Sequence, residues 1–142
     1  PDDRKNTHTF TRVYRHKHPV IAIEVDDNVH LRIDEGDLME LLGNLIDNAF
    51  KWCQNSIHIS AAYQKNQIKI QVRDDGPGIP SHEIARILER GARADQSISG
   101  HGIGLAIVRD IMQVYEGELL LENCVEQGLC VTLCFNQRFP GG

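Results

Sequence analysis

Residues 34–52 read DEGDLMELLGNLIDNAFKW, and this stretch decides most of the fold. Apolar side chains recur in it at three- and four-residue spacing, the period at which an α-helix buries one side. The members of this apolar stripe are Leu38, Leu41, Leu42, Leu45, Ile46 and Ala49. Asp34 is a suitable N-cap residue, and the carboxylate of Asp37 suits the first turn, where the helix dipole is positive. The pattern therefore predicts a long helix with one buried side.

The opposite side of this helix is polar. Its members follow one another at steps of four and three residues, which places them on one face, away from the leucines. They are Glu40, Asn44, Asn48 and Lys51. An amide oxygen that faces a pocket suits Mg²⁺, which keeps water and phosphate oxygens as its other ligands, and Lys51 adds positive charge for phosphate. A solvated helix face has the same appearance, so this segment alone does not decide between the two interpretations.

Alternating apolar residues predict strands on both sides of the helix. Val20–Val25 is expected to form a strand, with 29–33 as its hairpin partner after a turn. Residues 57–61 and 68–72 are expected to form a second hairpin, with Lys65-Asn66 between them. Two local pairs of strands therefore account for the first half of the chain.

The second half is expected to hold two more helices and two more strands. Ser81 is expected to cap a short helix that ends at about Leu88, and another helix is expected to begin near Leu105. The strands are 118–124 and 129–135. About five strands in a mixed sheet, packed on three helices, form a two-layer α/β sandwich.

Size and composition limit the classes of function. The chain has 142 residues and a formal net charge of −5, which suits one domain without a basic surface for nucleic acid or anionic lipid. Its apolar runs have five residues or fewer, whereas a membrane-spanning helix needs about 20, and no signal peptide opens the chain. We therefore expect a soluble domain in a cytosolic environment.

The four cysteines are interpreted as small apolar residues. No C-x-x-C pair is present, and the spacings do not match those of zinc ligands. They are Cys53, Cys124, Cys130 and Cys134, and the last three lie in apolar, strand-like stretches. A reduced cysteine in such a stretch packs as a small hydrophobe.

Two further segments conflict with good core building. The stretch DDGPGIP at 74–80 follows a strand, and its glycines and prolines form a rigid turn that allows backbone to approach a flat ligand. Asp74 is suited to accept a hydrogen bond from an exocyclic amine such as that of adenine. An ordinary acidic turn has the same composition, so DDG alone carries little weight.

The stretch GHGIGLA at 100–106 runs into a helix. Alternating glycines expose successive N–H groups, and a helix N-terminus adds partial positive charge, so an anion is expected here. A loop rather than a strand precedes it, which excludes a dinucleotide-binding fingerprint, and no G-K-[ST] follows, which excludes a P-loop. Together the three segments supply a metal ligand, an adenine reader and a phosphate cradle.

These segments resemble the boxes of the GHKL superfamily of ATP-binding domains, and within it the sensor histidine kinases. Residues 44–52 resemble the N box, 74–78 the G1 box and 100–104 the G2 box, in the same order and spacing. The longer stretches EGDLMELLGN and RGARAD are similar to magnesium-responsive sensors of the PhoQ type. The resemblance covers nearly the whole chain and implies the Bergerat α/β sandwich, with ATP under a lid formed by about 90–99.

The resemblance also implies roles for individual residues. Asn48 would hold Mg²⁺, Asp74 would accept from the adenine amine, and Trp52 would flank the adenine. Asn44, Lys51 and Arg93 would act at the phosphates, with Arg90 the second candidate for the lid cation. The nucleotide-binding set is Asn44, Asn48, Lys51, Trp52, Asp74, Gly76, Gly78, Ile79, Arg93, Gly100, His101, Gly102, Ile103, Gly104 and Leu105.

Asn44 separates the chain from the ATPases of this superfamily. Those enzymes have a glutamate four residues before the metal-binding asparagine, and it activates water. Asn44 cannot act as that base, whereas a kinase has no use for it, since its acceptor imidazole is already nucleophilic. The chain also departs from PhoQ-like kinases at Ile98 and His101, where they carry Arg and Gln, and at Leu88, where they carry Phe.

By resemblance the chain is a piece of a longer kinase. We expect a linker with a short helix in 1–18, the ATP-binding catalytic domain in 19–136 and a tail in 137–142. No segment with a phosphoacceptor histidine is present, so the expected partners are ATP, a separate dimerisation and phosphoacceptor domain and, indirectly, a response regulator. The piece is expected to be a monomer, and the full kinase a homodimer in the bacterial inner membrane.

Three other functions stay open. A serine kinase of the anti-sigma-factor kind has a similar length. A nucleotide-sensing or scaffold domain, suggested by Ile98, would bind ATP without transferring phosphate. An ATPase would release phosphate steadily, and Asn44 argues against it.

Overall fold

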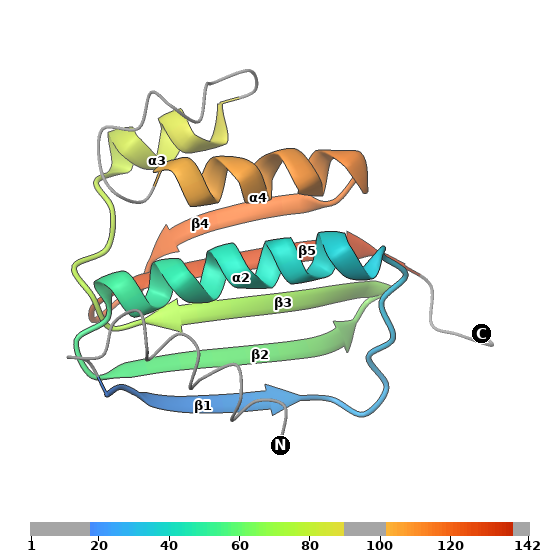
Figure 1. The fold of residues 1–142 in the computed structure, drawn as a ribbon, viewed down its shortest axis with the longest axis horizontal. Coiled ribbons are helices and arrows are strands. Elements are labelled where there is room, and N and C mark those ends of the chain that lie inside the picture. Colours follow the sequence, from blue (N-terminus) through green and yellow to red (C-terminus); the bar gives the residue numbers. More distant parts are fainter. Residues whose placement is uncertain (1–17, 90–101, 138–142) are drawn as a thin grey trace.

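The computed structural model describes residues 18–89 and 102–137. Residues 1–17 of the linker in which a short helix was expected, and residues 138–142 of the expected tail, lie outside the described residues. In the described part, five strands form one layer and three helices the other (Figure 1). The elements are β1 (Val20–Val25), α2 (Glu35–Trp52), β2 (Ser56–Gln64), β3 (Gln67–Asp74), α3 (Ser81–Leu88), α4 (Gly102–Val114), β4 (Glu118–Asn123) and β5 (Leu129–Asn136). The predicted two-layer α/β sandwich is confirmed.

The strand order across the sheet is β1-β2-β3-β5-β4. β1 and β2 are parallel and are joined by α2, because two parallel neighbours need a crossover connection. The other pairs are antiparallel. Lys65 and Asn66 have φ angles of 52° and 63°, the left-handed conformation of a two-residue type I′ turn, so the predicted hairpin of β2 and β3 is confirmed.

The predicted hairpin partner of β1 is wrong. Residues 29–33 form no strand, and β1 pairs instead with β2, with Ile21 opposite Ile57. The side chain of Gln137 replaces a ladder: it accepts from Arg32 N over 2.9 Å and donates to the carbonyl of His30. The apolar residues of 29–33 still pack against the core, so the alternating pattern reports a buried side but not a paired strand.

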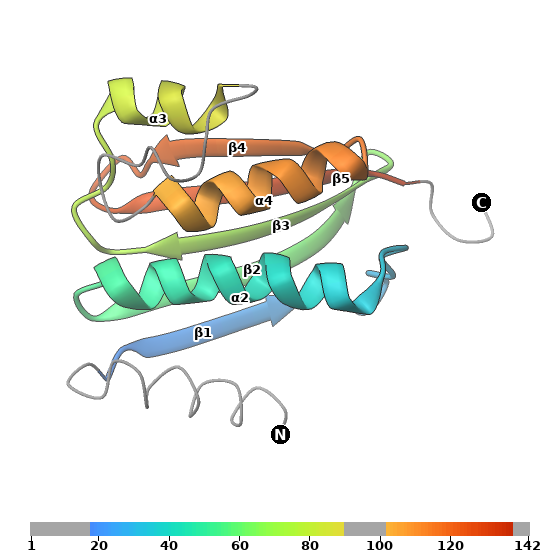
Figure 2. The ribbon, with the colours of Figure 1, turned by 45° about the horizontal axis from the view of Figure 1, so that its top comes forward.

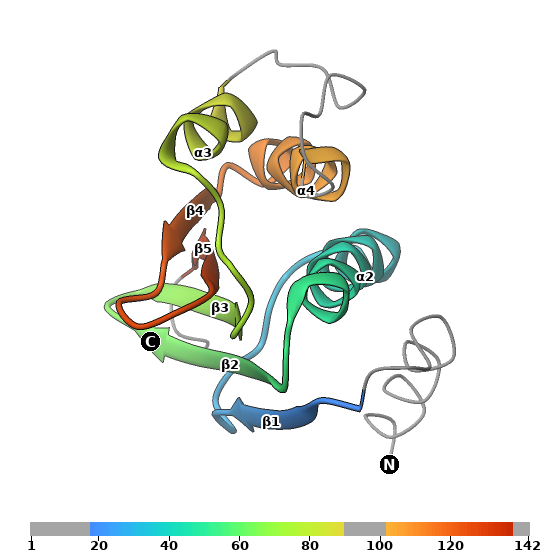
Figure 3. The same cartoon turned by 90° about the vertical axis from the view of Figure 1, so that its left-hand side faces the viewer.

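Helix α2 begins as the sequence predicts. Asp34 is its N-cap, and its Oδ2 accepts from Asp37 N over 3.1 Å. Leu41 and Leu45 are fully buried between the helix and the sheet. Figures 1 and 3 show that all three helices lie on the same side of the sheet.

The starts of α3 and α4 differ from prediction. Pro80 takes the N-cap position of α3 without a side-chain hydrogen bond, so Ser81 is the first helical residue rather than the cap. α4 begins at Gly102, three residues before the expected Leu105. Glycine lowers helix propensity, so the apolar pattern alone does not extend the helix this far towards its N-terminus.

Tyr115 follows the C-terminal end of α4 and joins it to the N-terminal end of α2 by hydrogen bonds. Its hydroxyl donates to Asp37 Oδ2 over 2.5 Å and accepts from Asp34 N over 3.1 Å. The hydrogen bond to Asp37 raises the pKa of Tyr115 above its ordinary value. Helices α2 and α4 also pack side by side, as Figure 2 shows.

All four cysteines are free thiols. Cys130 and Cys134 are buried, and Cys124 is half-buried. Burial raises the pKa of each of these three thiols, which keeps them protonated at neutral pH. Across the described ranges 18–89 and 102–137, no helix is long and apolar enough to cross a membrane.

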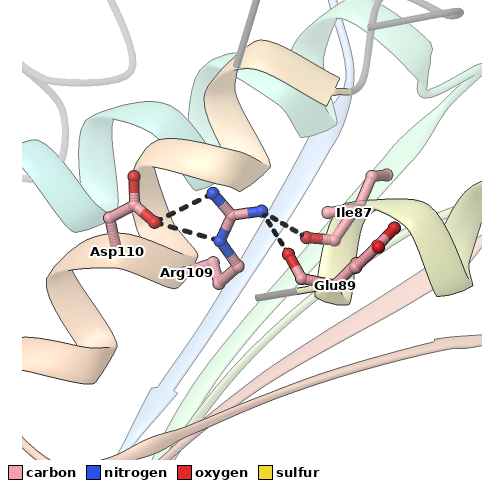
Figure 4. Close-up of polar contacts among 4 residues, drawn as sticks. All are labelled: Ile87, Glu89, Arg109 and Asp110. Carbon is pink, nitrogen blue, oxygen red and sulfur yellow. Dashed lines mark hydrogen bonds and ion pairs between the residues drawn. The ribbon is translucent and has the colours of Figure 1, made fainter. Parts of the chain in front are cut away.

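Arg109 joins α4 to the end of α3 (Figure 4). This residue is 6% exposed, and its Nη1 donates to the carbonyls of Ile87 and Glu89 over 2.9 and 3.1 Å. Its Nε and Nη2 donate to Asp110 Oδ1 over 3.0 and 2.9 Å. The last carbonyls of a helix lack partners within the helix and carry partial negative charge. The guanidinium donates one hydrogen bond to each of two such carbonyls.

We expect Arg109→Met to lower the free energy of unfolding by about 2–3 kcal/mol, because the buried carbonyl of Ile87 and the more exposed carbonyl of Glu89 lose a charged donor. Asp110→Asn is the matched control. The Asp110 side chain is 62% exposed, so its loss should cost less than about 1 kcal/mol after solvent screening. Urea denaturation measures both, and equal losses would contradict this account of Arg109.

Candidate functional site

The three predicted segments come from three different elements. The first is the second half of α2, the second is the loop that follows β3, and the third enters the first turn of α4. In Figure 2, α2 and α4 run next to each other in front of the sheet, with the end of β3 close to the end of α2. The topology therefore brings the segments to one end of the helical layer.

Asn44 and Gly104 bring α2 and α4 together. Asn44 Nδ2 donates to the carbonyl of Glu40 over 2.8 Å, and a Cβ added to Gly104 would lie 3.3 Å from Asn44 Oδ1. The donor side of the amide is thus used within α2, and its oxygen faces the start of α4. A side chain at position 104 would crowd the amide of Asn44, and glycine avoids this contact.

The remaining predicted residues of α2 take different positions. Asn48 is buried, with 7% of its surface exposed, although its polar side chain would be costly to desolvate without partners. Lys51 is exposed, and its Nζ lies 5.4 Å from the centre of the half-buried Trp52 ring. A cation at that distance from an indole face is attracted by the ring. Lys51 and Trp52 therefore form one unit at the end of the helix.

Asp74 is a buried carboxylate at the end of β3. It is 7% exposed, and its Oδ1 accepts from Gly76 N over 2.8 Å and from Leu129 N over 3.4 Å. A Cβ on Gly76 would lie 2.3 Å from the carbonyl oxygen of Trp52. The loop after β3 can therefore lie directly on the end of α2 because residue 76 is glycine.

Two predicted nucleotide-binding residues serve the core. The side chains of Ile79 and Leu105 are 2% and 0% exposed and belong to the main hydrophobic cluster. They anchor the loop after β3 and the first turns of α4, respectively. Gly78 has a φ of 78°, a conformation that favours glycine.

Arg93, Gly100 and His101 lie outside the described residues, as do Arg90 and Ile98. Gly102 and Ile103 form the first turn of α4. Of the predicted site, the described part thus joins Asn44 with Gly104 and Trp52 with Gly76. Among the described residues, no group of three or more His, Cys, Asp or Glu side chains is placed to hold a metal ion.

No sequence pattern indicated that Gly128 and Leu129 belong to the site. Gly128 has a φ of 103°, and a Cβ there would lie 1.8 Å from the carbonyl oxygen of Asp74. Two successive strands were expected here, but nothing in the sequence indicates that the turn between them packs on Asp74, because that contact spans more than 50 residues. The only available signal was the glycine itself.

Asp75 fastens the loop after β3 to the end of α2. Its Oδ1 accepts from Gln54 N over 2.7 Å, and its Oδ2 accepts from Asn55 N over 2.9 Å. Burial, the largest single influence, raises the pKa of Asp75, but the backbone N–H groups of Gln54, Ser56 and Asn55 together outweigh it. The net effect is a pKa below the usual 3.8.

A cavity of about 580 Å³ lies beside this region. It is lined by side chains of the uncovered sheet face, among them His58, Arg73 and Cys130, and it also touches Asp74 and Asp75. No described residue of α2 or α4 lines this cavity, so it is distinct from the space between Asn44 and Gly104.

The chain matches the family described as histidine kinase-, DNA gyrase B- and HSP90-like ATPases over residues 33–138. The chain belongs to this family. The predicted membership of the GHKL superfamily, with its Bergerat fold, is confirmed.

The curated relatives are sensor kinases. Over 124 residues the chain is 38% identical to the two-component sensor PhoQ of Pseudomonas aeruginosa, covering 87% of this chain and 28% of that protein. Over 131 residues it is 33% identical to the virulence sensor histidine kinase PhoQ of Salmonella typhimurium, covering 92% and 27%. The chain thus spans little more than a quarter of these relatives.

A solved structure agrees in fold. The chain superposes with a TM-score of 0.76 on full-length ShkA in complex with AMPPNP, with 24% identity, covering 98% of this chain and 30% of that one. The family match confirms the prediction of an ATP-binding catalytic domain of the histidine kinase-like type, and the domain is similar to that of the PhoQ relatives.

We expect the stability that Asp75 contributes to depend on pH. Because its pKa is lowered in the folded state, the contribution is present above the ordinary carboxyl pKa and is lost as pH falls through the folded value. Urea denaturation of the wild type and Asp75→Asn, from pH 7 to pH 3, should give free energies of unfolding that converge as pH falls. A difference independent of pH would contradict the role of the ionised carboxylate.

Proposed function

We propose that the domain binds Mg·ATP and supplies its γ-phosphoryl group to a histidine on a separate dimerisation and phosphoacceptor domain. The observation that carries the proposal is that α2 closely approaches both other segments of the site. Asn44 lies against Gly104, and Trp52 lies against Gly76. Glycine avoids a close contact at each junction, and each junction joins α2 to another predicted binding segment. The three segments, expected to bind the metal ion, the adenine and the phosphates, can then contact the same nucleotide.

The residues present fit ATP and Mg²⁺. Asp74 is buried at the strand end, where a carboxylate can accept from the adenine amine. The first turn of α4 has N–H groups without partners within the helix, which suit phosphate oxygens. Asn48 supplies an amide oxygen, a ligand type that Mg²⁺ accepts beside water and phosphate. Bound Mg²⁺ would supply neutralisation of phosphate charge.

The remaining roles concern charge and position. Lys51 is exposed at the end of α2 and can leave the Trp52 ring to meet a phosphate. Arg93, Gly100 and His101 are assigned to the phosphates on the resemblance alone. In the transfer, the bond from the γ-phosphorus to the bridging oxygen breaks, a bond to the imidazole nitrogen forms, and ADP leaves.

Asn44 supports transfer rather than hydrolysis. Its amide is used as a donor within α2 and has no basic atom with which to take a proton from water. A neutral imidazole needs no such base, so positioning and charge neutralisation suffice for catalysis. The same arrangement disfavours the ATPase alternative.

The wider context is part of the proposal. Within the longer protein, this domain would be cytoplasmic, would meet the phosphoacceptor domain of its own kinase, and would reach a response regulator only indirectly. The PhoQ relatives, described as a two-component sensor and a virulence sensor histidine kinase, support this context. The domain is proposed to extend over 19–136.

We expect Asn48→Ala and Asp74→Asn each to weaken Mg·ATP binding by at least about 100-fold, or roughly 2.7 kcal/mol. The first loses the metal ligand, and the second presents an amide where a carboxylate should accept from adenine. Calorimetry measures the affinities, and circular dichroism checks the fold. Glu40→Ala is the matched control, since this exposed residue lies on the same face of α2. Unchanged affinity in both variants would refute the site.

Incubation with γ-labelled ATP and a matching phosphoacceptor domain should transfer label to a histidine. A phosphohistidine is labile in acid and stable in base, so the two treatments identify the product. An acid-stable product would favour the serine kinase alternative. Binding without transfer would favour the nucleotide-sensing alternative, and steady release of phosphate by the isolated domain would favour an ATPase.

A further inference from the structure

The side chain of Asn123 holds the loop that follows β3. Asn123 is the last residue of β4, and its Oδ1 accepts from Ile79 N while its Nδ2 donates to Ile79 O, each over 2.8 Å. The amide thus pairs with both polar backbone groups of one residue, as a neighbouring strand would. Within the described part of the chain, Ile79 is not paired with the backbone of a neighbouring strand, and the Asn123 side chain makes the two hydrogen bonds that such a strand would make.

The position of Ile79 is set from two further directions. Its side chain is buried in the core, 2% exposed, which leaves it no freedom to rotate away. Immediately before it, Gly78 is so close to Asn123 that an added Cβ would lie 2.4 Å from Asn123 Oδ1. Asn123 therefore contacts the backbone of two successive loop residues.

The other end of the same loop is held by the same hairpin. Gln127 Nε2 donates to the carbonyl of Asp75 over 2.8 Å, and Leu129 N donates to Asp74 Oδ1. Gly128 lies against the carbonyl of Asp74. The hairpin of β4 and β5 thus contacts the end of β3, the first residue of the loop and again Ile79, which leaves the segment between them little room to shift.

Neither core packing nor strand propensity explains an asparagine at position 123. The residue is exposed, so it contributes little to the core, and asparagine is depleted in strands. What its amide provides is one donor and one acceptor at a fixed separation. Both are used on Ile79.

We propose that Asn123 is a positioning residue that sets the preference of the site for adenine over guanine. The inference rests on the proposed function, in which Asp74 accepts from the adenine amine. Guanine carries a carbonyl oxygen at that position, which a well-placed carboxylate repels. Asn123 holds the loop, and with it the place of the base relative to Asp74. When the loop loosens, the discrimination falls.

The test compares the affinities for Mg·ATP and Mg·GTP in the wild type, Asn123→Ala and Asn123→Asp. Asn123→Ala removes both hydrogen bonds to Ile79 and should lower the ratio of the two affinities roughly tenfold. Asn123→Asp keeps the acceptor for Ile79 N but loses the donor, and should give an intermediate ratio. Glu122→Ala is the matched control, because this neighbour is exposed and faces the other side of the sheet.

A second measurement needs no nucleotide. The amide hydrogen of Ile79 should be protected from exchange in the wild type and should exchange faster in Asn123→Ala, whereas exchange in the central strands should not change. Equal exchange of Ile79 in both proteins would overturn the inference even if the variant bound nucleotide poorly.

The outcomes separate the two proposals. If Asn123 is merely structural, Asn123→Ala lowers the melting temperature but keeps the wild-type ratio of affinities when both are measured well below melting, and the inference is overturned alone. A wild-type domain that binds neither nucleotide overturns the proposed function and the inference with it. A reduced ratio in Asn123→Ala, with Glu122→Ala unchanged, supports both.

Discussion

Helix α2 packs on two sides at once, and the rest of the structure depends on this packing. Its buried leucines lie in the core that it shares with the sheet, whereas Asn44 Oδ1 faces the start of α4. A helix in a two-layer domain normally leaves its second side to water, where polar residues cost nothing. Here Asn48 is almost fully buried. A neutral polar residue at this place is tolerable for stability only if it finds partners, and it is useful if one partner is a ligand.

The site is built from close approaches of backbone rather than from a cluster of charged side chains. Gly104 lets α4 approach Asn44, Gly76 lets the loop after β3 lie on Trp52, and Gly128 lets the last hairpin lie on Asp74. Each glycine removes a side chain at a junction between two elements. The same absence leaves N–H groups accessible, so packing of the elements and binding of an anion have a common origin. Folding and the geometry of the site are therefore hard to separate by substitution at these positions.

The patterns with a local cause were predictable. The stripe of α2 and its cap at Asp34 follow from helix periodicity and from the hydrogen bond that a carboxylate offers to a free N–H. The turn at Lys65-Asn66 was predicted from its place between two alternating runs. The wrong strand prediction had a non-local cause. Alternation at 29–33 was interpreted as a strand, but its backbone is satisfied by Gln137, which no local pattern reveals.

The sequence by itself determined the types of element, their order and the three segments from which the site is built, because periodicity, capping and glycine spacing act within a few residues. Only the tertiary structure decided which elements touch: the parallel pairing of β1 with β2, the contact of Asn44 with Gly104, and the hold of the last hairpin on Asp74 and Ile79. These contacts join residues far apart in the chain. Their geometry depends on how the helices and the sheet pack as a whole, and no short stretch of sequence contains that information.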